Sequence, residues 1–324
     1  MHPPHTPSPP PPGPVLRTVT GPLPAARVRG PVLAHEHLVL DLTRGTDGEA
    51  LLDGRHHDAV TAELTALREE YGLALVVELT CRGMGRDARA LTGIAERSGV
   101  AVVAATGWYY EPFHPDEVNG AGAEELTRIL VREAAGGLDG TAVLPGVIGE
   151  VGTHGDAPGA QEARTLTAAA HAARATGLSL ATHAQLGRGG LAQLELLTGA
   201  GLPPHRIGVG HQDLLDAPAV HREIAAAGAY VAFDTVGKES YQSDATRLRL
   251  LLSLLEAGHA DRVLLSCDIS RHGYLRSEGG QGYGHLFRSF LPMARAAGVD
   301  DDTVDLLTRR NPLRFLTGAS AEEI

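Results

Sequence analysis

The chain has 324 residues, of which 43% are hydrophobic and 21% charged, and this is enough apolar material for one large core. Its 39 acidic and 28 basic residues give a formal charge of −11, and we expect no nucleic-acid partner because such a surface repels phosphate backbones. We also expect no membrane span, since no apolar run approaches the roughly 20 residues required. The two cysteines, Cys81 and Cys267, are too few for a disulfide scaffold or a thiolate zinc cage.

The beginning of the chain is rich in proline. Half of the 20 prolines lie in residues 1–24, where they disfavour both helices and central strands. The opening letters, MHPPHTPSPPPPGP, also lack the basic and apolar regions of a secretory signal peptide. We therefore predict a disordered tail over residues 1–24, a single domain over residues 25–324, and a cytoplasmic location.

Short apolar runs recur along the rest of the chain and are continuous rather than alternating, as is typical of parallel strands buried on both faces. These predicted strands cover residues 31–35, 73–80, 100–106, 145–151, 178–183, 206–211, 229–233 and 262–268. Helix-like segments lie between them, for example at 57–71, 86–98, 123–136, 160–176, 217–227 and 244–258. Eight strands alternating with helices predict an α/β fold, a parallel (β/α)8 TIM barrel. A doubly wound open sheet is disfavoured because the chain lacks its glycine-rich nucleotide motifs.

Residues that can bind metals stand at the ends of five predicted strands. The first strand ends in His35-Glu36-His37, and residues two apart point to one face, so both imidazoles face the barrel mouth while Glu36 points away. The remaining ligand-type residues are Glu150, His183, His211 and Asp268. A single histidine at a strand end is usually structural. Six such residues at the face where TIM barrels place their active sites predict a site for two divalent metal ions.

Several longer motifs surround these residues. In chain order they are GPVLAHEH, GRD, ATGWYY, GVIGEVGTHG, ATH, VGHQD, FDTVGK and LLSCDISR. Together they resemble the phosphotriesterase family of the amidohydrolase superfamily, most closely its phosphotriesterase homology protein branch. The resemblance extends from about residue 28 to residue 316 and leaves out only the tail.

The resemblance implies a role for each metal ligand. His35, His37 and Asp268 would bind the more buried metal. His183 and His211 would bind the more exposed one, and Glu150 would bridge the two. Zinc is the default ion for a mixture of imidazole and carboxylate ligands, with manganese or cobalt as substitutes.

Two positions depart from the founding phosphotriesterases. Those enzymes carry a carbamylated lysine as the bridge, whereas this chain has Glu150 there. They also have a relay histidine after the aspartate that matches Asp234, and here Thr235 replaces it. The second departure argues against phosphotriester hydrolysis as the main activity.

The ligand set predicts a hydrolase that acts through a metal-bridging hydroxide, with Asp268 as the acceptor of its proton. The first hypothesis is a lactonase or carboxylic ester hydrolase for a small molecule, for instance a sugar lactone that carries a phosphate. The alternatives are an N-acyl amide hydrolase or an organophosphate triesterase on the same site, and a non-enzymatic metal-binding barrel. The complete ligand set disfavours the last alternative, and the sequence leaves a homodimer open.

Four further residues are candidates for substrate binding. Lys238 is the only lysine among the 28 basic residues, and Arg271 and Tyr274 follow the last predicted strand. TIM barrels often build phosphate sites from the loops after strands seven and eight, so we predict that these three residues form an anion clamp. The alternative is that Lys238 pairs with Glu239 or Asp234 on the surface. Tyr109 either reaches the substrate from the loop after the third strand or packs that loop.

Overall fold

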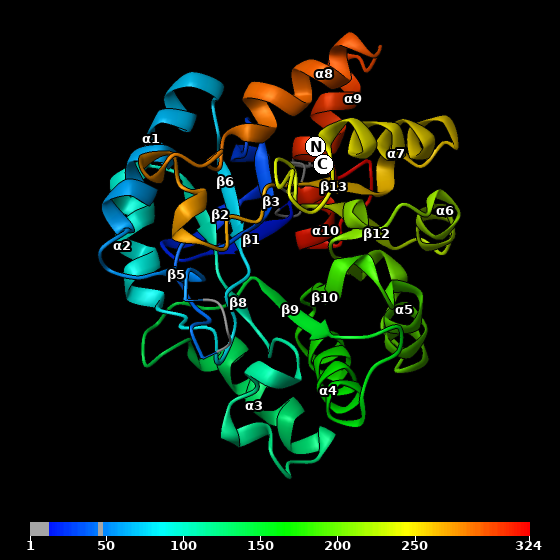
Figure 1. Cartoon of the computed structure of the whole chain (residues 1–324). Helices are drawn as coiled ribbons and strands as arrows, with labels where there is room; N and C mark the ends of the chain where they lie inside the picture. The colour runs from blue at the N-terminus through cyan, green and yellow to red at the C-terminus, as the bar shows by residue number, and fades with distance from the viewer. Residues whose placement is uncertain (1–12, 45–47) are drawn as a thin grey trace, which may run out of the picture.

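The computed structural model describes residues 13–44 and 48–324. Parallel strands form a ring with helices around its outside, which confirms the predicted α/β TIM-barrel class (Figure 1). In chain order, the barrel strands are β3 (Val32–Glu36), β6 (Leu75–Glu78), β7 (Ala101–Val103), β8 (Ala105–Thr106), β9 (Val147–Thr153), β10 (Leu180–Ala184), β11 (Ile207–Val209), β12 (Tyr230–Phe233) and β13 (Val263–Leu265). Because β7 and β8 are separated only by Ala104, they form one interrupted strand, and each strand falls within or beside a predicted one.

Helices cover the outside of the ring between successive strands. They are α1 (His57–Tyr71), α2 (Ala88–Ser98), α3 (Ala123–Gly136), α4 (Ala160–Thr176), α5 (Gly190–Gly199), α6 (Pro218–Ala226) and α7 (Asp244–Glu256). Three more follow the last strand: α8 (Leu291–Ala296), α9 (Asp301–Asp305) and α10 (Asn311–Thr317). Capping residues in the sequence determine where several of these helices begin and end. Asp87, for example, accepts from two backbone amides at the start of α2, and Gly72 ends α1 in the left-handed conformation that glycine adopts readily.

Hydrogen-bonded ladders connect the strands in two groups. One ladder runs in the order β13-β12-β11-β10-β9-β8, and the other in the order β3-β6-β7. The chain itself joins the two groups at β7 and β8. At the other seam, between β13 and β3, the backbone amide of Asp268 donates to the carbonyl oxygen of His35 at 3.3 Å.

Apolar side chains fill the inside of the barrel at the amino-terminal ends of the strands. Small and branched side chains of the strands, such as Ala34, Val77 and Leu264, pack there with Leu313 and Phe315 of α10. The inner faces of the helices pack on the outside of the strands in a second, larger cluster. Because apolar side chains occupy the amino-terminal ends of the strands, the polar residues gather at the carboxyl ends.

The structure corrects the predicted disordered tail. Val15–Thr18 (β1) and Gly21–Pro24 (β2) form an antiparallel hairpin in which Leu16 is buried. The Arg17 guanidinium donates to the carbonyl oxygen of Ala134 at 2.9 Å. Prolines are tolerated in such a hairpin because its outer edges need no hydrogen-bond donor. Residues 1–12 of the predicted tail lie outside the described residues.

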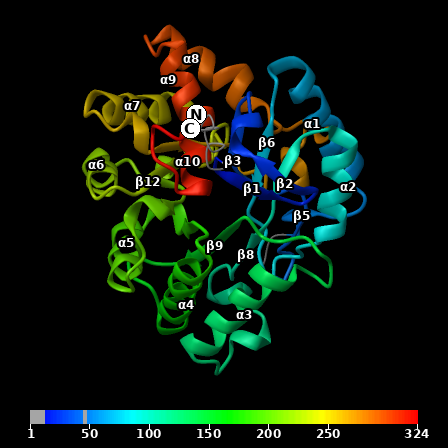
Figure 2. The ribbon, with the colours of Figure 1, turned by 180° about the vertical axis from the view of Figure 1, so that it is seen from behind.

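The hairpin lies close to the carboxyl end of the described chain. Seen from behind, β1 lies beside α10 (Figure 2). A second, shorter pair, β4 (Leu40–Asp41) and β5 (Leu51–Leu52), is also antiparallel. Within the described ranges, no helix combines the length and the apolar character needed to cross a membrane.

The hairpin should contribute measurably to stability. Deleting residues 1–24 should lower the melting temperature by about 5 °C relative to deleting residues 1–12, because only the longer deletion removes the buried Leu16, worth about 2 kcal/mol. Thermal unfolding of the two truncated proteins measures the difference. Equal melting temperatures would show that the hairpin does not stabilise the barrel.

Candidate metal centre

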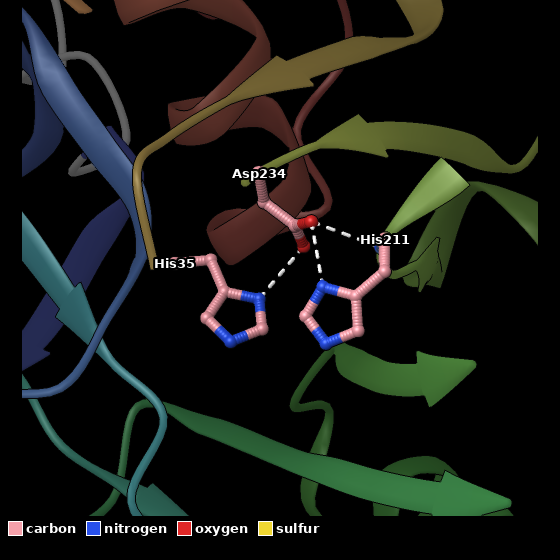
Figure 3. A group of neighbouring side chains, drawn as sticks. All are labelled: His35, His211 and Asp234. Carbon is pink, nitrogen blue, oxygen red and sulfur yellow. Dashed lines mark hydrogen bonds and ion pairs between the residues drawn. The ribbon is translucent and has the colours of Figure 1, made fainter. Parts of the chain in front are cut away.

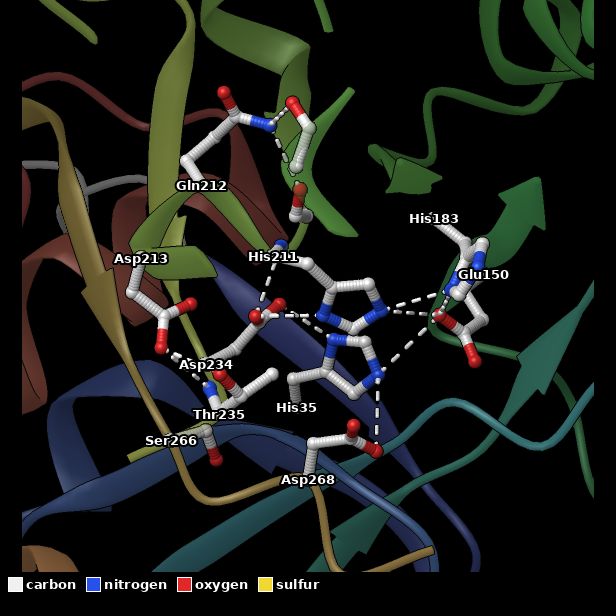
Figure 4. Close-up of polar contacts among 12 residues, drawn as sticks. His35, Glu150, His183, His211, Gln212, Asp213, Asp234, Thr235, Ser266 and Asp268 are labelled. Atoms are coloured by element: carbon white, nitrogen blue, oxygen red, sulfur yellow. Dashed lines mark hydrogen bonds and ion pairs between the residues drawn. The ribbon is translucent and has the colours of Figure 1, made fainter. Parts of the chain in front are cut away.

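A polar cavity of about 350 Å³ lies at the carboxyl ends of the strands. Five of the six predicted ligands line it: His37, Glu150, His183, His211 and Asp268. His35 is buried beside them, with its Nε2 atom 3.5 Å from Glu150 Oε2. The structure thus brings together all six side chains, which lie in or directly after five different strands, and Figure 4 shows five of them: His35, Glu150, His183, His211 and Asp268.

Bulges in two strands turn ligands toward this cavity. Between paired positions, β3 has one residue more than β6, and β9 has one residue more than β10. A bulge interrupts the alternation of side chains, so Ala34 and the neighbouring His35 both face the inside of the ring. The bulge in β9 falls at Gly149 and Glu150. Strict alternation along each strand therefore does not describe the site.

The carboxylate of Asp234, which follows β12, holds two of the histidines (Figure 3). Its Oδ2 lies 2.8 Å from His35 Nδ1, and its Oδ1 lies 2.8 Å from His211 Nδ1. A carboxylate only accepts hydrogen bonds, so both Nδ1 atoms carry protons and each ring directs its Nε2 toward the cavity, where His211 Nε2 lies 2.8 Å from His183 Nδ1. Burial opposes ionisation of Asp234, but the neighbouring His211 and His35 outweigh it and hold the pKa of this carboxyl well below its usual range.

The other two histidines are held by neutral side chains. The Thr80 hydroxyl donates to the carbonyl oxygen of Val39 at 2.6 Å, so it accepts from His37 Nδ1 at 2.8 Å. The Gln185 amide oxygen accepts from His183 Nε2 at 2.7 Å. His37 consequently presents Nε2 to the cavity, and His183 presents Nδ1.

The spacing of the facing atoms fits metal coordination. His37 Nε2 lies 3.4 Å from Glu150 Oε1 and 3.3 Å from Asp268 Oδ1, and His211 Nε2 lies 3.4 Å from Glu150 Oε2. Ligand atoms about 2.1 Å from one tetrahedral zinc ion are about 3.4 Å apart, so these separations match the edges of a coordination shell. His35 Nε2 and Asp268 Oδ1 are also buried without a hydrogen-bond partner. The residues present therefore fit divalent metal ions.

Glu150 belongs to two of the three groups of potential ligands among the described residues. These two are His35, His37 and Glu150, and Glu150, His183 and His211, while the third consists of His35, His211 and Asp234, and the ligand atoms of each group lie within 4.8 Å of one another. Burial opposes ionisation of Glu150, but the surrounding imidazoles hold the pKa of its carboxyl well below the usual range. This central position is the one that a bridging ligand needs.

The structure places Lys238 inside the site. Its side chain is only 6% exposed, and its Nζ atom contacts the Asp268 carboxylate and lies 3.0 Å from Ser270 Oγ. Burial disfavours the charged amine, but the Asp268 carboxylate outweighs burial and raises the pKa of Lys238. The alternative of a surface pair with Glu239 or Asp234 is therefore wrong.

The other predicted substrate contacts lie around the same cavity. Arg271 lines it and donates to the Tyr241 hydroxyl at 3.3 Å, while the Tyr274 ring lies 5.3 Å from Lys238 Nζ and 5.8 Å from the Arg271 guanidinium carbon. Tyr274 thus supports the two cations with its ring, and Tyr241 is the tyrosine that lines the cavity beside Arg271. The Tyr109 hydroxyl lies 3.5 Å from His183 Nε2, and its ring forms part of the cavity wall.

Sequence reasoning missed the residues that orient the histidines. Asp234 carried a signal, since it is a carboxylate directly after a predicted strand. Thr80 and Gln185 gave no such signal in the sequence, because threonine and glutamine are common after a strand. Their hydrogen-bond partners depend on the register of neighbouring strands. Tyr241 lies in a loop whose path only the structure gives.

A TIM barrel with histidines and carboxylates clustered at the carboxyl ends of its strands is the architecture of a metal-dependent hydrolase. The sequence profile of the phosphotriesterase family matches residues 14–316, and this chain belongs to that family. The match confirms the resemblance found in the sequence motifs.

Several known proteins are similar to this chain. The phosphotriesterase homology protein of Escherichia coli K12 is 37% identical over 287 residues, which are 88% of this chain and 97% of that protein. Its crystal structure, with phosphate in the active site, superposes with a TM-score of 0.86 at 36% identity and covers 89% of this chain and 99% of that one. The N-acetyltaurine hydrolase of Danio rerio is 33% identical, with 83% of this chain and 80% of that protein covered. A mutant of a phosphotriesterase-like lactonase from Deinococcus radiodurans has a TM-score of 0.81 at 32% identity, with 93% and 99% covered.

Replacing Asp234 by Asn should reduce metal binding. The side-chain amide would offer an NH2 group to one of the two histidines, which forces that ring to carry its proton on Nε2 and removes the lone pair that faces the cavity. We expect the variant to retain about one zinc ion fewer per chain than the wild type on dialysis, as measured by elemental analysis.

Asp244 provides a matched control, because its carboxylate accepts from His285 Nε2 at 2.7 Å but belongs to none of the three ligand groups. Asp244→Asn should keep the metal content of the wild type. Equal metal content in the Asp234→Asn variant would contradict the role given to Asp234.

Proposed function

We propose that this hydrolase binds two zinc ions and cleaves a carboxylic ester, in the first place a lactone, in a small molecule that carries an anionic group. The proposal rests on one observation: two groups of ligands that share Glu150 lie in the same cavity as the cations Lys238 and Arg271. Metal ligands and cations around one cavity suit a substrate with a reactive carbonyl at one end and a negative charge at the other.

Each ligand has a proposed place. His35, His37 and Asp268 would hold one ion, and His183 and His211 the other, with Glu150 shared. Divalent ions in such a site supply Lewis acidity toward a carbonyl oxygen and lower the pKa of water. Manganese or cobalt suits the same ligands as substitutes.

Asp268 is the proposed proton acceptor. The Lys238 ammonium contacts its Oδ2, while Oδ1 faces the imidazoles of His37 and His35. Burial opposes ionisation, but Lys238 and His37 hold the pKa of the Asp268 carboxyl well below its usual range. An ionised carboxylate in the wall of the cavity can accept a proton from the attacking water and pass it to the leaving oxygen.

The anionic group of the substrate would bind between Lys238 and Arg271. Arg271 lies at the cavity wall beside the Tyr241 hydroxyl, and its planar guanidinium can bind two oxygens of a phosphate at once. Lys238 lies deeper, against Asp268. Lys238 therefore serves both the charged end of the substrate and the reacting end.

The similarity to N-acetyltaurine hydrolases supports amide hydrolysis as a second candidate function. The relative from Danio rerio is 33% identical over 284 residues. N-acetyltaurine combines an amide carbonyl with a sulfonate, so it has the same arrangement of carbonyl and anion as a phosphorylated lactone. Phosphotriester hydrolysis is less favoured, because Thr235 donates its hydroxyl to Asp213 and is not a relay histidine.

The metal content tests the dinuclear proposal. Protein purified and dialysed without chelator should contain about two divalent ions per chain, and Glu150→Gln should lose most of both, since an amide bridges two ions poorly. Elemental analysis of active protein gives the count. Active protein with one ion or none would overturn the dinuclear site.

The substrate class is tested with a panel of neutral lactones, phosphorylated lactones, N-acyl amino sulfonates and organophosphate triesters. A phosphorylated lactone should have the highest kcat/KM. If the N-acyl amide exceeds it, the second candidate function is correct.

Variants of the two cations should separate binding of the anion from the reaction. Arg271→Ala should raise KM for the phosphorylated lactone about tenfold, equal to about 1.4 kcal/mol of binding, and affect a neutral lactone much less. Lys238→Ala should impair both substrates, because Lys238 contacts Asp268. Steady-state kinetics on both substrates gives the comparison. Equal losses for charged and neutral lactones in Arg271→Ala would contradict the anion site.

A further inference from the structure

Glu36, between His35 and His37, is completely buried and does not line the cavity. Its carboxylate accepts three hydrogen bonds from the chain that follows β13. Oε1 accepts from the backbone amide of Cys267 at 2.8 Å and from Ser266 Oγ at 2.7 Å, and Oε2 accepts from the backbone amide of Ile269 at 2.8 Å. A single side chain of β3 therefore holds the end of the neighbouring strand.

The two amides that Glu36 binds lie on either side of Asp268. Asp268 has a φ of 48°, in the left-handed region that costs a non-glycine residue about 1 kcal/mol or more. Among the described strands, β3 and β13 are not neighbours in any ladder, and across this seam the backbone amide of Asp268 donates to the carbonyl oxygen of His35 at 3.3 Å. The carboxylate of Glu36 adds three hydrogen bonds to this backbone contact, two of them to the residues on either side of Asp268.

We propose that Glu36 is a positioning residue that aims Asp268 into the metal centre. The His35-Glu36-His37 motif then supplies two ligands, His35 and His37. Through Glu36 it also fixes a third ligand, Asp268, which follows the last strand. This inference rests on the proposed function, in which Asp268 binds a metal ion.

A purely structural role makes a different prediction. If Glu36 only closes the barrel, its loss should lower stability and leave zinc affinity unchanged. If Glu36 positions Asp268, its loss should weaken zinc binding by more than the loss of another buried carboxylate of the same kind.

Glu162 is that matched carboxylate. It is 3% exposed, and its two oxygens accept from the backbone amides of His154 at 3.0 Å and Gly159 at 2.9 Å, at the start of α4. Like Glu36, it connects backbone segments through a buried carboxylate. It contacts none of the proposed ligands through these bonds.

The test uses Glu36→Gln and Glu162→Gln. Glutamine has one acceptor oxygen, so in Glu36→Gln one amide beside Asp268 faces an NH2 group and the segment must shift. Zinc affinity is measured by returning zinc to chelator-treated protein in competition with a chromophoric chelator, and thermal unfolding is followed in parallel. We expect Glu36→Gln to weaken zinc binding tenfold or more and Glu162→Gln to change it less than twofold.

A double-mutant cycle with Asp268→Asn then shows whether Glu36 acts through Asp268. In that background Glu36→Gln should weaken zinc binding by less than threefold, because the ligand that it positions is already lost. The same tenfold effect in both backgrounds, or wild-type zinc affinity in Glu36→Gln, would overturn the inference. If Glu36→Gln does not fold, Glu36→Asp replaces it, since its shorter carboxylate can reach at most one of the two amides, and unchanged zinc affinity there also overturns the inference.

Zinc binding by the wild-type protein distinguishes a failure of the proposed function from a failure of the role given to Glu36. If it binds no zinc in this assay, the proposed function fails. If it binds two zinc ions and Glu36→Gln binds them equally well, only the role of Glu36 fails.

Discussion

The site depends on the direction in which each buried imidazole presents its lone pair. Asp234 sets that direction for His35 and His211 together, because one carboxylate accepts from both Nδ1 atoms. It thereby connects a candidate ligand on the first barrel strand with a candidate ligand after the sixth. Since neither ring can rotate without losing a buried hydrogen bond, the two Nε2 atoms stay directed at Glu150.

The barrel supplies the rigid frame on which this arrangement depends. Ligands that are distant in the chain reach one cavity because parallel strands end at the same face, and two bulges turn His35 and Glu150 inward. Several buried carboxylates in one place are costly unless cations neutralise them. Lys238 neutralises part of that charge, and the geometry of the remaining donors suits divalent ions.

The sequence predicted the barrel, its strand order and the six ligand-type residues, because these depend on local apolar runs and on residues directly at strand ends. It did not predict the hairpin at β1 and β2, since proline-rich composition hides a pairing that depends on packing against α10 and β7. The contacts of Thr80, Gln185 and Tyr241 could not be predicted from the sequence either, because each contact joins separate loops or strands. Lys238 was singled out as the only lysine and by its place after the seventh predicted strand, yet its contact with Asp268 depends on the path of the loop after β12.

The apolar side chains packed inside the barrel determine how substrate enters and product leaves the enzyme. Leu16 of the hairpin and Phe315 of α10 pack with the strand side chains inside the barrel, so the cavity does not continue through to the amino-terminal end. The products of hydrolysis must then leave by the mouth through which the substrate entered. Under the proposed function, a product that keeps the anionic group and gains a carboxylate would pass Lys238 and Arg271 on its way out. Its release, rather than bond cleavage, is then a natural candidate for the slow step of turnover, and accumulated product would compete with fresh substrate.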